Sequence, residues 1–241
     1  MHRFFIDSVS GDTALLTDPA QLHHLRDVLR LKTGSAVLLS DVAGNDYAGV
    51  ITSIDKKQAI MQVVQKRPAP TPHVMLTLAC AVPKGSRFDE AIDHLTQLGV
   101  TRIVPMLTER VEVKPDAAAA AARLKRWRKI AQSAAQQSRQ SKITVIEPLT
   151  AFGDVVLNSQ EYNLKLIPHL TGERRPLKDF FAASLPRNII VLIGPEGDFT
   201  PEEVALALDN GFVSVSLGDT VLRVATAAIA AASYIRFTIN S

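Results

Sequence analysis

The stretch that decides the fold runs from residue 189 to residue 203 and reads IIVLIGPEGDFTPEE. Its first five residues, 189–193, form an uninterrupted apolar run, which is typical of a strand buried on both faces of a sheet. Thr200 is followed by Pro201 and, three residues on, by Glu203, which is the spacing of a capping box and predicts the start of a helix. A strand, a glycine-containing turn and a helix in this order indicate an open α/β sheet, and such sheets bind ligands at these turns.

The turn between that strand and that helix contains Gly194, Pro195, Glu196, Gly197 and Asp198. It is not a phosphate-binding P-loop, because the Lys-Ser/Thr pair of that motif is missing. Its two carboxylates and two more just beyond, at Glu202 and Glu203, would repel a phosphate despite the favourable helix dipole. The expected ligand is therefore neutral or cationic. The alternative is a tight turn and a helix cap without any ligand.

A second glycine-containing turn lies between a predicted strand, 213–217, and the last predicted helix, 224–237. It contains Leu217, Gly218, Leu222 and Arg223. Two such turns at the ends of late strands suggest one pocket with two walls. The helix that follows is rich in alanine, which reflects either helix propensity or a close helix contact, for instance between two subunits.

Strand-like and helical segments alternate from residue 74 onward. The predicted strands are 74–82, 102–106, 143–146, 164–167, 189–193 and 213–217, and the predicted helices are 87–98, 117–140, 177–183, 201–208 and 224–237. Apolar strands that alternate with helices predict an α/β fold, with a mostly parallel sheet covered on both faces.

The N-terminal segment is β-rich with one early helix. Asp18 followed by Pro19 is a helix start signal, and strand-like runs follow at 36–39, 47–54 and 59–64. This pattern predicts a barrel-like β module of about 70 residues. Three prolines within residues 67–72 indicate a stiff linker. We therefore expect two domains, at residues 1–70 and 71–241.

The composition excludes several classes of protein. A single cysteine, Cys80, excludes an internal disulfide framework, and six histidines without ligand spacing argue against a metal site. No apolar run approaches the roughly 18 residues of a membrane span, and the N-terminal run is too short for a signal peptide. We therefore expect a cytoplasmic protein with neither a metal nor a membrane partner. A net charge of +3 and a pI of about 9.1 mildly favour an anionic partner.

Basic residues are concentrated in the predicted long helix. From residue 117 to residue 146 the chain has no acidic residue, and Lys125, Lys129 and Arg139 share the side opposite the predicted core positions. The early helix adds Arg26 and Arg30. A solvated face usually mixes signs, so this distribution favours contact with RNA phosphates over a plain solvated surface.

Short motifs follow one another along the chain. They are HLRDVLRL at 24–31, QLGV at 97–100, TER at 108–110, RWRKIA at 126–131, AAQQSR at 134–139, GPEG at 194–197, LG at 217–218, LR at 222–223 and TA at 226–227. In this order and spacing the chain resembles the SPOUT superfamily of RNA methyltransferases. More narrowly, it resembles the RsmE-type family over almost its whole length. Members of that family methylate N3 of a uridine in 16S ribosomal RNA with S-adenosylmethionine.

The resemblance implies a trefoil-knotted SPOUT methyltransferase domain, which is an exception to the rule against knots, and a small N-terminal PUA-like β-barrel domain that binds RNA. It implies a homodimer that acts on the 16S ribosomal RNA of the small ribosomal subunit. The cofactor is a sulfonium cation and suits the acidic first turn. The residues that the resemblance implies for its binding are Gly194, Pro195, Glu196, Gly197, Leu217, Gly218, Leu222, Arg223 and Thr226.

Methylation at N3 requires that the uracil ring lose its N3 proton. Arg223 or Arg139 is a candidate to stabilise the negative charge that develops on a uracil oxygen, and either arginine is also a candidate phosphate contact. Glu196 is a candidate proton acceptor, and bulk water is the other candidate.

The chain departs from the family pattern at three positions. Gln97 stands where the family usually has Glu, Asp198 where it has Gly, and Ala225 where it has an acidic residue. Asp198 raises the question of a positive φ, which Asp tolerates better than most residues. Ala225 motivates one alternative function, a ribosomal-RNA-binding protein with weakened catalysis. A second alternative is ribose 2′-O-methylation, another SPOUT activity, against which the full-length resemblance and the N-terminal domain argue.

Overall fold

The computed structural model describes residues 1–41, 44–67, 74–83, 85, 87–111, 115–170, 172–181 and 186–239. The chain forms two compact units, one of Met1–Thr71 with Ala135–Ile143 and one of Pro72–Ala134 with Thr144–Ser241. The first unit thus takes in the end of the long helix, which was predicted to belong to the second domain. Most of the proline-rich linker predicted at 67–72 lies outside the described residues.

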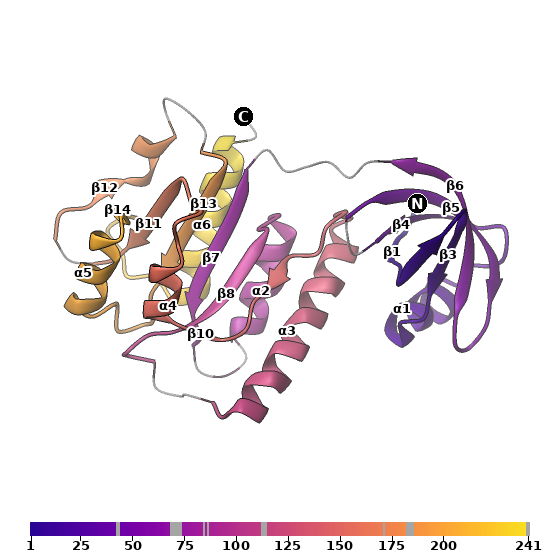
Figure 1. The fold of residues 1–241 in the computed structure, drawn as a ribbon, viewed down its shortest axis with the longest axis horizontal. Helices are drawn as coiled ribbons and strands as arrows, with labels where there is room; N and C mark the ends of the chain where they lie inside the picture. The colour runs from indigo at the N-terminus through magenta and orange to yellow at the C-terminus, as the bar shows by residue number, and fades with distance from the viewer. Residues whose placement is uncertain are drawn as a thin grey trace. The chain divides into compact units, whose positions relative to one another are not determined.

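The first unit is built on one curled six-stranded sheet (Figure 1), in the order β1-β4-β5-β6-β3-β2. Its strands are β1 (Arg3–Phe5), β2 (Ser8–Ser10), β3 (Thr13–Leu16), β4 (Ala36–Ser40), β5 (Asp46–Ile54) and β6 (Ala59–Arg67). β1 and β2 are opposite ends of this order, yet only two residues separate them in the chain. Ile6 N donates to Ser40 O at 2.9 Å, and Asp7 N donates to Leu15 O at 2.9 Å. The sheet must therefore curl until its two ends meet, and this closure encloses an apolar core.

The early helix begins as predicted. Asp18 accepts a hydrogen bond from Gln21 N, and α1 (Pro19–His23) continues directly into a π-helical turn, η1 (His24–Val28). Leu22 and Leu25 are buried, so this segment packs against the sheet. The turn ends at Arg30, whose φ of 51° is left-handed.

The segment 135–143 is tied to the curled sheet through Asp46. This carboxylate accepts hydrogen bonds from Arg3, from Ser40 at 2.8 Å and from Ser141 at 2.6 Å. Burial raises the pKa of Asp46, but the hydrogen bonds from Arg3, Ser141 and Ser40 outweigh burial, so the pKa lies below its usual value.

The second unit is built on an eight-stranded sheet in which every pair is parallel. Its order is β10-β8-β7-β13-β11-β14-β12, and β9 pairs with β8 beside β10. The strands are β7 (Met75–Ala81), β8 (Arg102–Leu107), β9 (Val145–Ile146), β10 (Thr150–Ala151), β11 (Leu164–Pro168), β12 (Arg175–Pro176), β13 (Asn188–Ile193) and β14 (Val213–Ser216). The predicted parallel sheet is confirmed, and β13 lies near its centre, as its apolar sequence requires.

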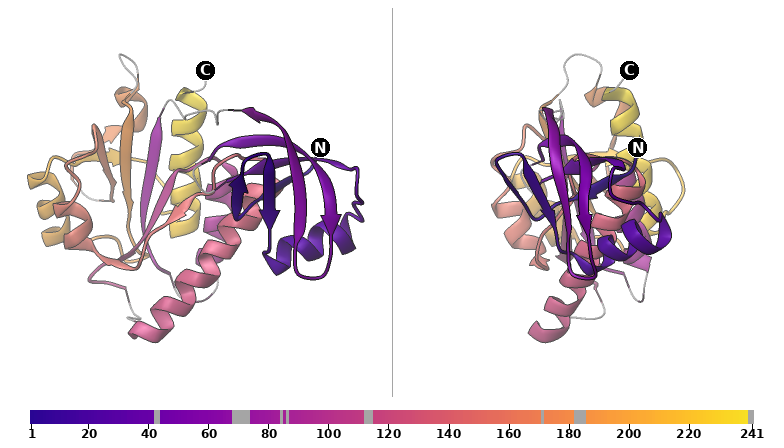
Figure 2. Two further views of the ribbon diagram at one scale, coloured as in Figure 1. Left: turned by 45° about the vertical axis from the view of Figure 1, so that its right-hand side comes forward. Right: turned by 90° about the vertical axis from the view of Figure 1, so that its right-hand side faces the viewer.

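Helices cover both faces of this sheet, and Figure 2 shows α6 and α4 on opposite sides of the strands. α4 (Phe152–Leu157) and α5 (Pro201–Asp209) pack in one apolar cluster with Ile190 and Leu192 of β13. On the other side, α2 (Arg87–Gln97) packs against α6 (Val224–Ile239). Successive side chains of a strand point to opposite faces, so β13 contributes to both layers.

Arg236 ties α6 to the rest of the second unit. Its buried guanidinium donates to Val74 O at 3.0 Å and to Gly99 O. Burial lowers its pKa. Because both acceptors are backbone carbonyls at the start of β7 and after α2, this side chain fixes the position of α6.

Three predicted elements differ from the structure. The long helix α3 (Ala117–Gln137) ends three residues earlier than predicted, because Arg139 is left-handed with a φ of 58° and Gln140 N donates back to Ala135 O. The predicted strand 143–146 is only the short β9. In place of the predicted helix 177–183, the structure has a 3₁₀ turn, η2 (Leu177–Phe180), and residues 182–185 lie outside the described range. α4 was not predicted, since six residues give too little periodicity.

We predict that Asp46→Ala lowers the free energy of unfolding by about 3 kcal/mol, because it leaves the buried Arg3 guanidinium without its carboxylate. Urea unfolding measures this change. Asp12→Ala is the control, since Asp12 is exposed and should change stability by less than about 0.5 kcal/mol.

The same pair of variants gives a pH test. The native pKa of Asp46 is lowered, so its contribution to stability is complete above the unfolded pKa of about 3.9 and is lost as the pH falls through the native value. The stability difference between wild type and Asp46→Ala should therefore shrink below about pH 4. A difference that stays constant into strong acid contradicts this account.

Candidate functional site

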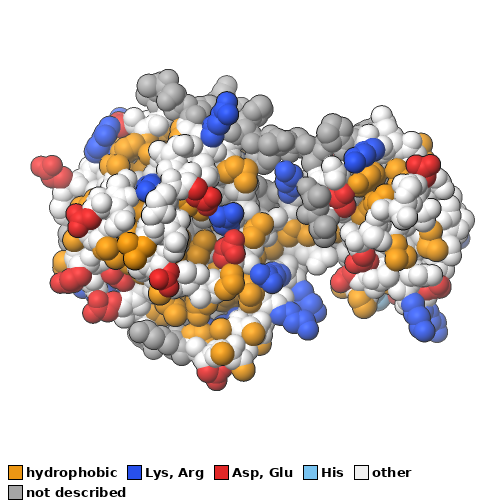
Figure 3. Space-filling view, in the orientation of Figure 1, with side chains coloured by type: hydrophobic (Ala, Val, Ile, Leu, Met, Phe, Trp, Pro, Cys, Tyr) orange, Lys and Arg blue, Asp and Glu red, His pale blue; other side chains and the backbone are white. Residues whose placement is uncertain are grey.

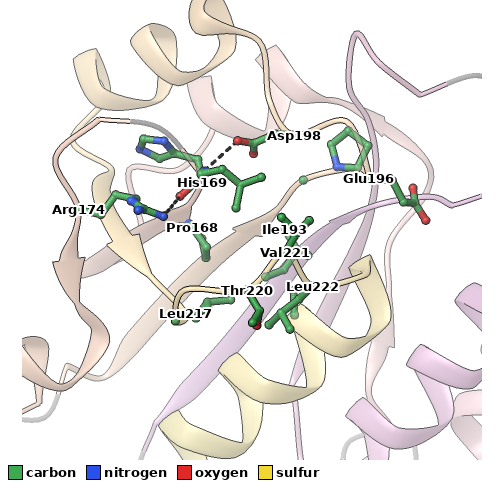
Figure 4. Close-up of a pocket in the computed structure, with 15 residues that line it drawn as sticks. Pro168, His169, Arg174, Ile193, Glu196, Asp198, Leu217, Thr220, Val221 and Leu222 are labelled. Atoms are coloured by element: carbon green, nitrogen blue, oxygen red, sulfur yellow. Dashed lines mark hydrogen bonds between the residues drawn. The ribbon is translucent and has the colours of Figure 1, made fainter.

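The described residues form a pocket of about 550 Å³ at one edge of the parallel sheet (Figure 4). Its walls are the segments that follow β11, β13 and β14, with Ala227 of α6. Parallel strands end at the same edge, so these three segments lie together although they are far apart in the sequence. The two predicted glycine-containing turns supply two of the walls.

The loop after β13 is closely fixed at both ends. A Cβ on Gly194 would lie 3.0 Å from the buried Phe199 ring, so any larger residue there would require the ring to shift. The predicted capping box is confirmed: Glu203 N donates to Thr200 Oγ1 at 3.2 Å and Thr200 N donates to Glu203 Oε2 at 3.0 Å. The second oxygen of Glu203 accepts from Glu109 N at 2.8 Å. One buried carboxylate thus starts α5 and also holds the segment after β8.

Asp198 connects two walls of the pocket. Its φ is 61°, which answers the question raised by the sequence: this position is left-handed. Its carboxylate accepts from Leu170 N at 2.9 Å, a contact drawn in Figure 4. Asp in place of the family's Gly therefore keeps a left-handed turn and adds a bond from the β13 loop to the β11 loop.

The third wall was not predicted, and it consists of Pro168, His169, Leu170 and Arg174. His169 is buried; its Nε2 lies 2.7 Å from Ser214 Oγ, and its Nδ1 has no hydrogen-bond partner among the described residues. Burial lowers the pKa of His169, and the charge of Asp198 opposes this effect only in part. Arg174 donates to His169 O at 3.1 Å. The strand that precedes this wall was predicted from the sequence. Because open α/β sheets bind ligands beyond the carboxyl ends of their strands, the end of this strand was the signal that could have predicted the wall.

The wall after β14 offers room at Gly218. Its φ of 120° is strongly disfavoured for other residues, and a Cβ there would meet no atom within 4 Å. Gly218 N donates to Ser216 Oγ at 3.2 Å, which fixes the turn. Ile193, Leu217 and Leu222 make this side of the pocket apolar.

The nine residues predicted to bind the cofactor fall into two groups. Six line the pocket: Gly194, Pro195, Glu196, Leu217, Gly218 and Leu222. The other three lie outside its lining: Arg223 and Thr226 are exposed at the start of α6, and Gly197 lies beside Arg110. Arg110 itself was noted only as part of a motif, and it donates to the carbonyls of Gly197 and Phe199.

The residues predicted to contact RNA are divided between the two units. Lys125 and Lys129 are exposed on α3 in the second unit, whereas Arg26, Arg30 and Arg139 belong to the first. Arg26 donates to both carboxylate oxygens of Asp27, so a phosphate must compete with this acid. The backbone at Arg30 and at Arg139 is left-handed, with φ of 51° and 58°.

Charge is unevenly distributed on the second unit. In Figure 3, Lys and Arg side chains gather over α3, and Asp and Glu side chains gather over α5. Although α3 itself has no acidic residue, it contacts an acid of another helix, because Arg126 pairs with Asp89 of α2.

Among the described residues, no cluster of His, Cys, Asp and Glu has the size of a metal site, and no helix is long and apolar enough to cross a membrane.

The chain matches two family models. Residues 70–236 match the family model of the RNA methyltransferase domain, and residues 16–64 match that of the RNA methyltransferase PUA domain. Two relatives, each named Ribosomal RNA small subunit methyltransferase E, come from Synechocystis and Rickettsia conorii. The first is 36% identical over 92% of this chain and 72% of its own length. The second is 28% identical over 98% of this chain and 95% of its own length.

Two solved structures are similar over nearly the whole chain. One is the Ribosomal RNA small subunit methyltransferase E of Neisseria gonorrhoeae bound to S-adenosylmethionine, 28% identical, with a TM-score of 0.85 and coverage of 98% of this chain and 97% of that one. The other is a Legionella pneumophila methyltransferase with bound S-adenosylmethionine, 29% identical, with a TM-score of 0.86 and coverage of 98% and 96%.

We predict that Asp198→Gly speeds hydrogen exchange of the Leu170 amide by at least about tenfold, since a hydrogen bond to a charged group contributes about 1.5–3 kcal/mol. Asp198→Asn is the matched control, because Asn tolerates a left-handed φ and keeps an acceptor oxygen. Exchange measured by NMR should be much closer to wild type for Asn than for Gly. Equal protection in all three proteins would show that the bond does not hold the two walls together.

Proposed function

Because the chain belongs to the family of RNA methyltransferases that includes ribosomal RNA small subunit methyltransferase E, we propose that it transfers a methyl group from S-adenosylmethionine to N3 of a uridine in 16S ribosomal RNA. The observation that carries this proposal is the pocket at the carboxyl ends of β11, β13 and β14. Its two sequence-predicted walls are the turns that the resemblance assigned to the cofactor.

Several features of the pocket suit S-adenosylmethionine. Gly218 leaves open space where any other residue would place a Cβ, and apolar side chains beside it suit the adenine ring. Glu196 and Asp198 bring negative charge to a cationic sulfonium. His169 also lines the pocket, and its Nδ1 has no hydrogen-bond partner among the described residues. We therefore propose the six predicted residues that line the pocket as the binding set, with His169 and Arg174 of the third wall added.

The reaction needs a proton acceptor and a group that stabilises the negative charge of the uracil ring. When bound, S-adenosylmethionine supplies a methyl carbon on sulfur: the N3 electron pair forms the new C–N bond as the C–S bond breaks, and that bond's electrons remain on sulfur. Glu196 is our candidate to accept the N3 proton, directly or through water. Arg223, exposed next to the pocket-lining Leu222, is our candidate to stabilise the negative charge on a uracil oxygen.

We propose that the PUA domain and α3 hold the RNA through its phosphates. Arg30 and Arg139 of the first unit and Lys125 and Lys129 of the second are exposed, and no ion pair engages them in the described parts of the chain. Arg26 contacts a phosphate only when its hydrogen bonds to the Asp27 carboxylate are broken. A ribosomal RNA substrate also places the work of this protein in the cytoplasm.

A trefoil knot and a homodimer are part of the same proposal. After β14, near one end of the sheet, the chain returns through residues 217–223 to α6, which packs on the central strands β7 and β13; this return suits a knot. The face of α6 away from the sheet bears a stripe of exposed residues, among them Ala230, Tyr234 and Phe237. An aromatic stripe beside a small residue suits close packing against a second copy.

The reaction is tested by mass spectrometry of nucleosides from 16S RNA or small subunits incubated with the protein and methyl-deuterated S-adenosylmethionine. We expect the label on a uracil base at N3. A label on ribose would support 2′-O-methylation instead, and RNA binding without any label would support the RNA-binding alternative that Ala225 motivated.

The cofactor site is tested with Gly218→Val, which should weaken binding of S-adenosylmethionine by roughly tenfold or more in calorimetry, because the side chain occupies the ligand's space. Gly211→Val is the matched control. Gly211 also has a positive φ, 83°, and open space around its Cβ, but it does not line the pocket. Both variants therefore carry backbone strain, and only the first should lose affinity. If both variants bind S-adenosylmethionine with equal affinity, the cofactor site does not include the pocket beside Gly218.

A further inference from the structure

A second pocket lies on the other side of the β13 loop. It has a volume of about 960 Å³ and opens at the carboxyl ends of β7 and β8. Its lining includes Gly85, Arg87, Arg110, Arg123, Glu196 and Gly197. In the sheet order β8-β7-β13-β11-β14, the β13 loop is the middle one. The cofactor pocket therefore lies toward β11 and β14, and the second pocket lies toward β7 and β8.

The second pocket is strongly cationic. Its three arginines come from three different elements: Arg87 from the start of α2, Arg110 from the segment after β8, and Arg123 from α3. Arg87 and Arg123 have no ion pair within the described residues, and Arg110 donates to the backbone carbonyls of Gly197 and Phe199, which leaves its charge uncompensated. The nearby acid Asp89 is already engaged by Arg126 and by Trp127 Nε1.

Glu196 is the one carboxylate among the described lining residues of this pocket, and it lines both pockets. Pro195 is the other shared residue. Figure 4 shows the Glu196 side chain at the opposite end of the first pocket from Arg174. Ligands in the two pockets can therefore approach each other at Pro195 and Glu196, the residues that line both.

We propose that the second pocket binds the target nucleotide of the RNA, with its phosphates on Arg87 and Arg123 and its uracil ring toward Glu196. The inference rests on the proposed function, because it assigns a binding site to the nucleotide that accepts the methyl group. Guanidinium groups match phosphate oxygens in geometry and charge. A base that undergoes chemistry must leave its stack and enter a pocket, and this pocket lies within the size range of small-ligand sites. Arg110, which holds Gly197, acts as a positioning residue.

The test uses the full chain with Arg87→Glu and Arg123→Glu, and a 16S RNA fragment that contains the target uridine. Each variant should bind this RNA at least about tenfold more weakly, and the slope of log affinity against log salt should fall by about one for each arginine lost as a phosphate contact. Arg123→Lys should recover part of the affinity. Calorimetry with S-adenosylmethionine should give the wild-type affinity in every variant.

Lys178→Glu is the control, since it makes the same charge change at an exposed site outside both pockets. It should keep RNA affinity within about twofold of wild type at one salt concentration. If Arg87→Glu and Arg123→Glu behave like Lys178→Glu, the pocket does not bind RNA and the proposal is overturned. If a charge reversal abolishes cofactor binding through misfolding, Arg87→Gln and Arg123→Gln replace it under the same criteria.

The failure of this inference differs from the failure of the proposed function. If the wild-type protein methylates the RNA and the variants methylate and bind it equally well, the second pocket is not the nucleotide site and the proposed function stands. If the wild-type protein does not methylate the RNA, the proposed function is wrong. The RNA affinities of the variants then still decide whether the arginines form a nucleotide site.

Discussion

The site depends on one constraint, the parallel pairing of β8, β7, β13, β11 and β14 in that order. Parallel strands all end at one edge, so five segments that are distant in the sequence meet there. The strand in the middle of this order, β13, is followed by the loop that carries Gly194 and Glu196. That loop has a neighbour on each side, and each side holds a pocket. In the proposed function, this arrangement of strands brings the methyl donor and its acceptor together at Pro195 and Glu196, which line both pockets.

A shared wall is useful only if it keeps its shape. The β13 loop is bonded to both neighbours: the Asp198 carboxylate accepts from Leu170 N on one side, and Arg110 donates to the Gly197 carbonyl on the other. Glu203 adds a third connection through Glu109 N. Charge-assisted bonds of this kind are short and directional. In the proposed function, direct transfer requires the methyl carbon and N3 to be held in line and in contact, and a loop fixed from both sides helps to position both ligands.

The sequence was informative wherever the signal is local. The strand at 189–193, the capping box at Thr200 and the two glycine turns were predicted from neighbouring residues, and the left-handed φ of Asp198 was raised as a question. The wall around His169 and the cationic pocket were not predicted, because they depend on which strands become neighbours in the sheet. The end of α3 was placed too late because Arg139 occupies a left-handed position that usually holds Gly.

The most direct test of the shared wall is photocrosslinking of RNA that carries 4-thiouridine at the target position, with S-adenosylhomocysteine present to fill the cofactor pocket. The account predicts that mass spectrometry finds the crosslink on the peptides that line the second pocket, around Arg87, Arg110 or residues 195–197. Crosslinks found only on surfaces remote from this loop, such as α5, would contradict it.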